Sequence, residues 1–307
     1  MNKINLAIVG MGKIARDQHV PAIRNNSAYE LMAVASPRNS LDGVPHFKSI
    51  ESLLDGVPAL NAVSLCTPPQ VRFSVAAHAL RQGKHVMLEK PPGMTVSEVT
   101  ALSELAQQHG VTLYTTWHSR AAAAVEPARQ WLSSREIKRV TINWKEDVRV
   151  WHPGQDWIWQ AGGLGVFDPG INALSILTRI MPHAVRLKAA ELFIPTNRAT
   201  PIAANLTMES NNSPIDAQFD FRQTGPQSWD IEVHTNDGVL KLSNGGALMF
   251  INNSPVVTAQ DQEYPNLYAR FAELVSARKM DVDVTPLQLI ADAMLCGQQI
   301  SVEAFEW

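Results

Sequence analysis

Three groups of polar residues in this chain have side chains that could do chemistry. The first is Glu89-Lys90-Pro91, a carboxylate and an amine directly after a short apolar run. A lysine at the end of a buried strand lies at the carboxyl edge of a sheet, where open α/β sheets bind their ligands. The proline ends the strand and permits a cis bond before it. The alternative is an ordinary strand end with a solvated lysine.

The second group follows three glycines in residues 162–165. Glycines allow close approach of the backbone to a ligand. Pro169 suits the first turn of a helix, and Asp168 would then be its N-cap. Asp168 and Asn172 would lie one turn apart, so both could contact one small molecule. A plain capping aspartate is the alternative, and it does not exclude chemistry.

The third group is rich in tryptophan and histidine. It includes Glu146, Trp151, His152 and Trp157, and four of the eight tryptophans fall within residues 144–159. Indole faces beside carboxylates suit a sugar, which has apolar ring faces and many hydroxyls. A core cluster or a subunit interface is the alternative. His118 is a further candidate, although a lone histidine is more often structural.

A glycine motif typical of nucleotide-binding domains lies upstream of all three groups. Gly10-x-Gly12-x-x-Ala15 follows an apolar strand, residues 4–9, and opens a helix from about residue 14. The glycines allow a tight turn, and pyrophosphate can approach backbone N–H groups at the helix N-terminus. The motif alone is weak evidence, but its strand–turn–helix context favours a dinucleotide.

The end of the second strand, residues 31–35, bears on which dinucleotide binds. NAD enzymes usually place Asp or Glu there for the ribose hydroxyl, whereas this chain has Ala35-Ser36-Pro37-Arg38. A hydroxyl and a guanidinium suit a 2′-phosphate, because arginine offers forked donors and a fixed positive charge. We therefore favour NADP. The alternative is that Arg38 is a solvated loop residue and that NAD binds as well.

The elements that position these groups change character near residue 120. Before it, strands and helices alternate, which predicts a parallel doubly wound sheet in residues 1–120. After it, strands dominate residues 121–307, with Asp237-Gly238 as a hairpin signal. The further strands expected are 61–66, 86–88, 112–115, 140–148, 184–193, 202–208, 216–221, 229–235 and 239–242. The helices expected are 70–82, 95–109, 127–133, 265–277 and 286–303. The fold class is thus an α/β Rossmann domain plus an α+β domain.

Composition excludes several classes of protein. The 307 residues are 45% hydrophobic and 18% charged, as in soluble globular proteins, and the net charge of -3 argues against a nucleic-acid partner. The apolar run near the N-terminus is too short for a signal peptide or a membrane span. Two cysteines without ligand spacing indicate neither a metal site nor a disulfide framework. We expect a cytoplasmic protein with no metal and no membrane partner.

With these motifs in hand, the chain resembles the glucose–fructose oxidoreductase/inositol dehydrogenase (Gfo/Idh/MocA) family along nearly its whole length. The resemblance is carried by the Gly10/Gly12 loop, Thr67-Pro68, the run 83–91 and the stretch 162–168. Within the family, the chain is similar to the bacterial L-arabinose 1-dehydrogenase and D-galactose 1-dehydrogenase group. The segments carrying that closer similarity are 12–19, 116–120, 144–148, 151–154 and 167–172.

The resemblance implies a Rossmann domain and a C-terminal domain with a large, mostly antiparallel open sheet, which often forms the interface of a dimer or tetramer. It implies NAD(P)-dependent oxidation of an aldopyranose at C1 to the aldonolactone. We expect both L-arabinose and D-galactose to be oxidised, with L-arabinose preferred. The cofactor would be held by Gly10, Met11, Gly12, Lys13, Ile14, Ser36, Arg38, Cys66, Thr67, Pro68, Glu89 and Lys90. The sugar would be held by His118, Glu146, Trp151, His152 and Trp157.

Two departures from the family pattern affect the expected mechanism. Asn172 stands where the family commonly has an acid/base histidine, and an amide takes no proton at neutral pH. The acid/base role therefore passes to Asp168 first and Lys90 second, with Asn172 orienting the sugar. Pro69 and Arg72 stand where the family tends to have Asn and His, which alters the contacts on the nicotinamide side. The rival functions are a non-catalytic sugar sensor and a dehydrogenase of inositol or a nucleotide sugar.

Overall fold

The computed structural model describes residues 3–258 and 262–307, and it divides into two compact units. The first unit comprises Met1–His118 and Tyr264–Val284, and the second comprises Ser119–Glu263 and Thr285–Trp307. The sequence had assigned residues 264–284 to the second domain, and this assignment is wrong. The segment belongs to the first unit because Tyr114 pairs with Asp281 and because the hydroxyl of Tyr268 donates to Ser64.

The first unit is built on a parallel sheet of six strands in the order β3-β2-β1-β4-β5-β6. The order reverses between β1 and β4, as in a doubly wound fold, and this is where such sheets bind ligands. The strands are β1 (Ile4–Val9), β2 (Tyr29–Ala35), β3 (His46–Phe47), β4 (Ala62–Leu65), β5 (His85–Leu88) and β6 (Leu113–Thr115). The predicted Rossmann sheet is confirmed, and only the two-residue β3 was not expected.

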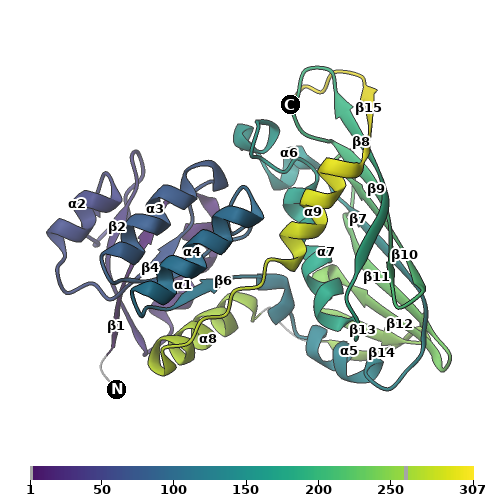
Figure 1. Ribbon diagram of the computed structural model, residues 1–307, viewed down its shortest axis with the longest axis horizontal. Helices are drawn as coiled ribbons and strands as arrows, with labels where there is room; N and C mark the ends of the chain where they lie inside the picture. The colour runs from purple at the N-terminus through teal and green to yellow at the C-terminus, as the bar shows by residue number, and fades with distance from the viewer. Residues whose placement is uncertain (1–2, 259–261) are drawn as a thin grey trace. The chain divides into compact units, whose positions relative to one another are not determined.

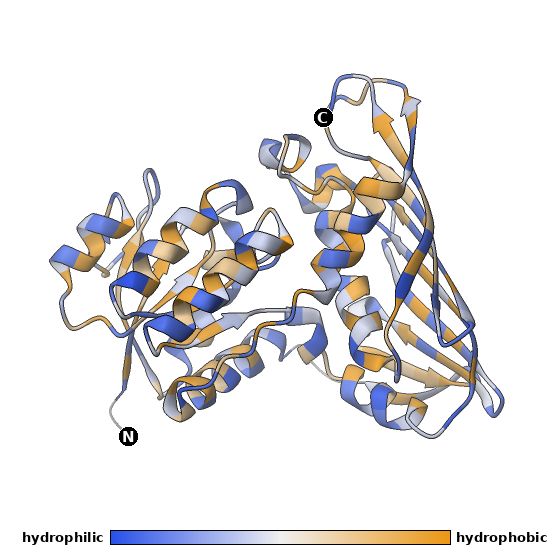
Figure 2. Ribbon diagram, viewed as in Figure 1, coloured by the Kyte–Doolittle hydropathy of each residue, from blue (hydrophilic) through white to orange (hydrophobic). Residues whose placement is uncertain are grey.

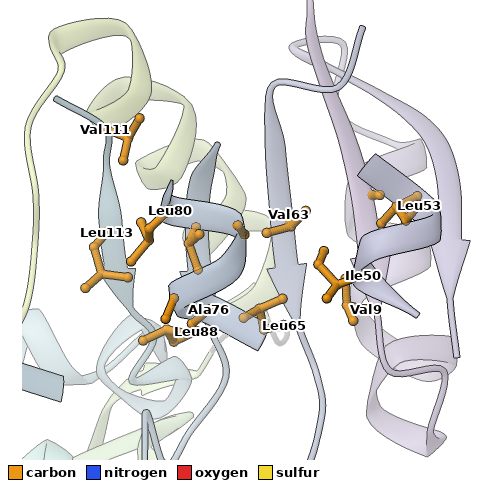
Figure 3. Packing of buried hydrophobic residues seen from close by; sticks show 14 of the residues in the cluster. Val9, Ile50, Leu53, Val63, Leu65, Ala76, Leu80, Leu88, Val111 and Leu113 are labelled. Atoms are coloured by element: carbon orange, nitrogen blue, oxygen red, sulfur yellow. The ribbon is translucent and has the colours of Figure 1, made fainter. Parts of the chain in front are cut away.

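Helices cover both faces of this sheet. One face packs against three helices through a buried apolar cluster that includes Leu53, Leu80 and Val63 (Figure 3). The other face packs against α8, where Phe271 stacks on Tyr114. The helical segments are the π-helical turn η1 (Ala15–His19), α1 (Val20–Arg24), α2 (Ile50–Gly56), α3 (Pro69–Arg81), α4 (Val96–Gln108) and α8 (Glu263–Ala277). Of these, α2 is the helix that the sequence pattern did not indicate.

The second unit is built on a mixed, mostly antiparallel sheet of nine strands in the order β14-β13-β12-β11-β7-β10-β9-β8-β15. Only the β7–β10 and β8–β15 pairs are parallel. Figure 2 shows hydrophobic and hydrophilic residues alternating along these strands, which is typical of a sheet with one buried face. The strands are β7 (Ile137–Lys145), β8 (Arg186–Pro195), β9 (Ala203–Ser210), β10 (Ser213–Asp220), β11 (Ser228–Thr235), β12 (Gly238–Ser243), β13 (Leu248–Ile251), β14 (Ser254–Thr258) and β15 (Gln298–Val302).

The helices of the second unit lie on one side of its sheet (Figure 1). The central one is α7, which contacts β7 and β11 and packs against both α5 and α9. Nearly all of α7 is buried, which explains its apolar sequence. The segments are η2 (His118–Ala121), α5 (Val125–Leu132), α6 (Val148–Trp151), η3 (Asp156–Trp159), α7 (Phe167–Ile180), η4 (Asn244–Gly246) and α9 (Thr285–Cys296). None of the helices in the described residues is long and apolar enough to cross a membrane.

Two of the expected elements are cut short in the structure, because the chain changes from strand to helix or from helix to strand within them. The expected strand 140–148 ends at Lys145, because the Asp147 side chain accepts a hydrogen bond from the N–H of Arg149 and caps α6. The expected helix 286–303 ends at Cys296, and the chain continues as β15 beside β8. In both places a helix and a strand adjoin without a clear turn signal, so periodicity alone could not separate them.

Candidate active site

Asp168 lies in the first turn of α7 and is 3% exposed. The expectation that it caps this helix is wrong, because the N-cap is Val166 and its side chain makes no capping bond. The Asp168 carboxylate is therefore not used as a cap. Asn172 follows one turn later on the same helix and is half-buried. The helix thus brings the carboxylate and the amide to one face, as the spacing predicted.

Glu146, His152 and Asp168 form a row of acid, imidazole and acid in the second unit. Glu146 directly follows β7 and is 2% exposed. Its Oε1 lies 2.9 Å from Nε2 of His152, which ends α6 and donates to it. The other ring nitrogen, Nδ1, lies 3.5 Å from Oδ2 of Asp168. No described residue hydrogen-bonds to Nδ1. The row therefore holds a half-buried imidazole between two buried carboxylates.

Two tryptophans lie beside this row. The indole N–H of Trp229, on β11, donates to Oε2 of Glu146 at 2.8 Å. Trp151 packs on Trp229 with ring centroids 4.7 Å apart, and its side chain is 41% exposed. An exposed indole next to a buried carboxylate can cover an apolar sugar face while the carboxylate accepts hydroxyl hydrogen bonds.

The remaining tryptophans of residues 144–159 divide between two roles. Trp144 and Trp159 are buried, and Trp159 packs against Phe221 and Phe305, so these two belong to the core. Trp157 is half-buried on η3. The interpretation of the tryptophan cluster as core is therefore correct for Trp144 and Trp159. Trp151 and Trp157 are the accessible indoles of the cluster.

The glycines before α7 serve chain packing. A Cβ on Gly163 would lie 2.3 Å from the carbonyl oxygen of Trp157. A Cβ on Gly165, whose φ is +52°, would lie 2.3 Å from the carbonyl oxygen of Pro201. Both positions require glycine because another part of the main chain passes close by. At these two positions the close approach of the backbone is therefore to the chain itself rather than to a ligand.

The Gly10–Ala15 turn in the first unit has the geometry of a dinucleotide loop. Gly10 has φ +96°, and a Cβ there would lie 2.8 Å from the backbone of Cys66 and Thr67, so the turn packs directly on the end of β4. A Cβ on Gly12 would meet nothing within 4 Å, which leaves open space over the loop. The buried Oγ1 of Thr67 has no hydrogen-bond partner among the described residues. An open cradle beside an unpartnered hydroxyl fits a nucleotide.

The end of β2 carries the two residues expected to choose between cofactors. Ser36 is buried, and its Oγ accepts from the N–H of Asn39 at 3.4 Å. Arg38 is exposed, and its guanidinium has no hydrogen bond or ion pair with any residue in the described ranges. The loop therefore places an exposed guanidinium two residues after a buried hydroxyl. Lys13 is also exposed but pairs with Asp17.

Lys90 follows β5 and is joined to Pro91 by a cis bond. The preceding residue, Glu89, is buried, and its Oε2 accepts the Lys90 N–H at 2.7 Å. Its Oε1 accepts from His19 Nε2 at 3.1 Å and from the Tyr264 hydroxyl at 2.8 Å. Both oxygens of the Glu89 carboxylate are thus hydrogen-bonded within the chain itself.

The surroundings of the His19–Glu89 pair favour the charged form of both side chains, although the pair lies in the core. Burial alone would raise the pKa of Glu89, but hydrogen bonds from His19 and Tyr264 and the nearby positive charge hold it far below its usual value. Burial likewise works against a charge on His19, yet Cys66, Tyr268 and Glu89 hold its pKa well above the usual value. A carboxylate is therefore maintained next to Lys90 at neutral pH.

His118 lies in the first unit, where its ring stacks on Tyr264 at 5.5 Å. Met11 and Cys66 lie near the dinucleotide loop, and both cysteines are free thiols. In the described residues no group of three or more His, Cys, Asp or Glu side chains could hold a metal ion.

Three contributors were missed by sequence reasoning. Trp229 is brought to Glu146 only by the pairing of β11 with β7, where it faces Trp144. Arg72, noted only as a departure, is 3% exposed and donates to main-chain carbonyls. His19 follows the dinucleotide loop by one helical turn and carried no separate signal. Such contacts depend on tertiary pairing, which no local pattern encodes.

Comparison with known proteins is consistent with this architecture. The model of an oxidoreductase family with an NAD-binding Rossmann fold, Gfo/Idh/MocA, matches residues 4–116. Galactose 1-dehydrogenase from Pseudomonas fluorescens is 44% identical over 306 residues, covering 99% of both chains. A crystal structure of a D-galactose-1-dehydrogenase protein from Rhizobium etli is 54% identical with a TM-score of 0.95, covering 100% of this chain and 99% of that one. A 3-ketoreductase from Actinomadura kijaniata, crystallised with NADP and TDP-benzene, has a TM-score of 0.85 at 18% identity over 98% of this chain and 100% of that one, and so shares the fold. The chain belongs to the Gfo/Idh/MocA family of oxidoreductases.

Proposed function

We propose that this protein is an aldose 1-dehydrogenase that oxidises D-galactose and L-arabinose at C1 to the aldonolactone, with NADP as the hydride acceptor. The observation that carries the proposal is the row of Glu146, His152 and Asp168, with its two buried carboxylates, next to the exposed indole of Trp151. The full-length similarity to galactose 1-dehydrogenase supports a sugar substrate.

The residues of the first unit fit the cofactor. The N–H groups after Gly12 would bind the pyrophosphate, and the Thr67 hydroxyl would hydrogen-bond the bound nucleotide. Ser36 and Arg38 would bind a 2′-phosphate. When bound, the nicotinamide supplies a hydride acceptor, and this chemistry belongs to the cofactor rather than to the protein. The further loop contacts, from Met11, Lys13, Ile14, Cys66 and Pro68, are proposed on the family resemblance.

The protein's own part in the reaction is position and proton transfer. The C1 hydroxyl of the sugar loses its proton to a carboxylate oxygen of Asp168 as the C1–H bond gives up its hydride, and the C1–O single bond becomes a double bond. The Lys90 amine would hydrogen-bond the C1 oxygen or the ring oxygen, and is the alternative proton acceptor. The Asn172 amide would orient the sugar, while Glu146, His152 and His118 would bind its other hydroxyls.

Substrate choice depends on one group. L-Arabinopyranose and D-galactopyranose have matching hydroxyls at C2, C3 and C4 and differ by an exocyclic hydroxymethyl group. A pocket that leaves room for this group and pairs its hydroxyl accepts both sugars. The two galactose 1-dehydrogenase relatives support activity on D-galactose, the larger of the two sugars. Activity on L-arabinose is the expectation from the sequence.

A substrate panel tests this function. NADPH or NADH absorbance is followed with D-galactose, L-arabinose, D-glucose and myo-inositol, each with NADP and with NAD. We expect rapid reduction with galactose and arabinose, faster with NADP. Reduction with inositol alone would assign another dehydrogenase activity, and NADP binding without any turnover would assign a sensor.

Replacing Arg38 by alanine should weaken NADP binding and leave NAD binding nearly unchanged. A hydrogen bond to a charged group contributes about 1.5 to 3 kcal/mol, which corresponds to about 10- to 100-fold in NADP dissociation constant. Fluorescence titration of both cofactors measures this ratio, and Arg24→Ala, an exposed arginine at the end of α1, is the matched control. Equal loss for NAD and NADP would contradict the assignment.

We also propose that the protein is a cytoplasmic homo-oligomer, a dimer or tetramer formed through the nine-stranded sheet. The support is the family resemblance and the polar character of the sheet face that points away from α7. On that face Arg139 pairs with Asp216 at 2.7 Å, and Lys145 donates to Gln218 at 2.8 Å.

A further inference from the structure

The main chain of Glu89, Lys90 and Pro91 is bound from two sides by buried side chains. We propose that Arg72, together with the His19–Glu89 pair, is a positioning device for the reaction: these residues hold the main chain at the end of β5 and thereby fix the base of the Lys90 side chain. This inference rests on the proposed role of Lys90 and adds to it three residues that act through the main chain at the end of β5. We call Arg72, Glu89 and His19 the clamp.

The first side of the clamp is Arg72, which extends from α3 into the core. Its Nη1 donates to the carbonyl oxygens of Glu89, at 2.5 Å, and of Pro91, and its Nη2 donates to that of Thr67. One guanidinium therefore joins the ends of the neighbouring strands β4 and β5. Arginine suits this task because its planar fork offers five donors in fixed directions.

The second side of the clamp is the Glu89 carboxylate, which is fixed from both of its oxygens. Oε2 accepts the Lys90 N–H, and Oε1 accepts from His19 and Tyr264. His19 is itself held, because its Nδ1 lies 2.7 Å from the Tyr268 hydroxyl. The main chain of Lys90 is thus connected through Glu89 to side chains from η1 and α8. A shift of this main chain would disturb the hydrogen bonds of a buried carboxylate and a buried imidazole, which is strongly unfavourable.

The clamp matters because a lysine side chain is long and flexible. With its main chain fixed, only the side-chain dihedrals remain to place the amine. In an active site a misplacement of about 1 Å can lower the rate by about 10²-fold. Residues that hold the main chain of a catalytic lysine can therefore affect turnover without contacting the substrate.

A double-mutant cycle separates positioning from plain stability. Arg72→Lys keeps the charge but loses the fork, and Glu89→Gln keeps the shape but loses the charge. We expect each to lower kcat for D-galactose by about 10-fold or more while the KM for NADP changes little. In a Lys90→Met background the same substitutions should change the residual kcat by less than about 2-fold, because they act through Lys90.

The same variants are followed without substrate by hydrogen exchange of the Lys90 amide, read from peptides that cover residues 85–95. We expect faster exchange in Arg72→Lys and Glu89→Gln, and no change in Arg81→Lys, an exposed arginine on the same helix. Equal losses of kcat with and without Lys90, or unchanged exchange, would overturn the clamp. Turnover that is lost in Lys90→Met but unaffected by Arg72→Lys and Glu89→Gln would overturn the clamp alone, whereas a protein that oxidises no sugar would refute the proposed function and, with it, the role of the clamp in the reaction.

Discussion

Replacing Asp168 by asparagine is expected to lower kcat for D-galactose by about 10²-fold or more, the usual scale for loss of a general base. The substitution keeps the shape of the side chain but removes the oxygen that would take the C1 hydroxyl proton. Asp168 is 3% exposed, and its Oδ2 lies 3.5 Å from Nδ1 of His152 in the row that would bind the sugar. Steady-state rates of NADPH formation measure the effect.

The Asp168 variant needs two controls. Asp237→Asn, on the exposed hairpin of the same unit, should keep normal turnover. NADP affinity measured by fluorescence should also be unchanged in Asp168→Asn, because the cofactor loop lies in the other unit. Turnover close to normal in Asp168→Asn would remove this residue from the mechanism and pass the role of base to Lys90.

Replacing Lys90 by methionine has the second large expected effect. Methionine has a similar length but no amine, so it cannot hydrogen-bond the C1 oxygen. The negative charge that develops on this oxygen in the transition state would then lack a hydrogen-bond donor. We therefore expect kcat to fall by about 10²-fold or more, a scale typical of removing one such donor. The substrate KM should change much less than kcat, since the interaction strengthens in the transition state.

The alternative role for Lys90 gives a different outcome. If the lysine only bound the cofactor, Lys90→Met would raise the KM for NADP and leave kcat at saturating cofactor near normal. Lys84→Met is the matched control, because this lysine lies before β5 and donates to the carbonyl oxygen of Leu60. We expect Lys84→Met to keep both kcat and the KM for NADP.

Most of the Rossmann unit could be predicted from the sequence, because its elements have strong local signals. β1 is an apolar run and agrees with the expected residues 4–9, and α3 differs from the expected helix by one residue at each end. What could not be predicted depends on tertiary packing. α8 has the pattern of an ordinary helix in the C-terminal half, and tertiary contacts such as those of Tyr264, Tyr268 and Phe271 place it in the first unit.

The second unit was harder to predict because its later strands carry weak patterns. β13 and β14 are short strands after the Asn244 turn, and β15 adjoins α9 without a break. β15 exists because β8 provides an edge for pairing, and strand propensity depends strongly on such partners. A sequence window cannot contain a partner that lies a hundred residues away.

In the candidate site, too, some features could be predicted from the sequence and others depend on tertiary packing. Glu146, His152 and Asp168 could be chosen from residue type and spacing, and the structure brings them into one row. The roles of Gly163 and Gly165 were misjudged, because glycine is needed equally for a ligand and for passing backbone. Arg72 could be seen only as an unusual residue, since its three carbonyl partners come from the ends of two strands.

The most direct test of the central claim uses D-galactose that carries deuterium at C1. The protein is incubated with this sugar and NADP, and the reduced cofactor is analysed by mass spectrometry together with the sugar product. The account predicts one deuterium in the nicotinamide ring, a slower hydride step than with unlabelled sugar, and galactonolactone as the first product. Reduced cofactor without deuterium, or oxidation at another carbon, would contradict the claim that C1 is the hydride donor.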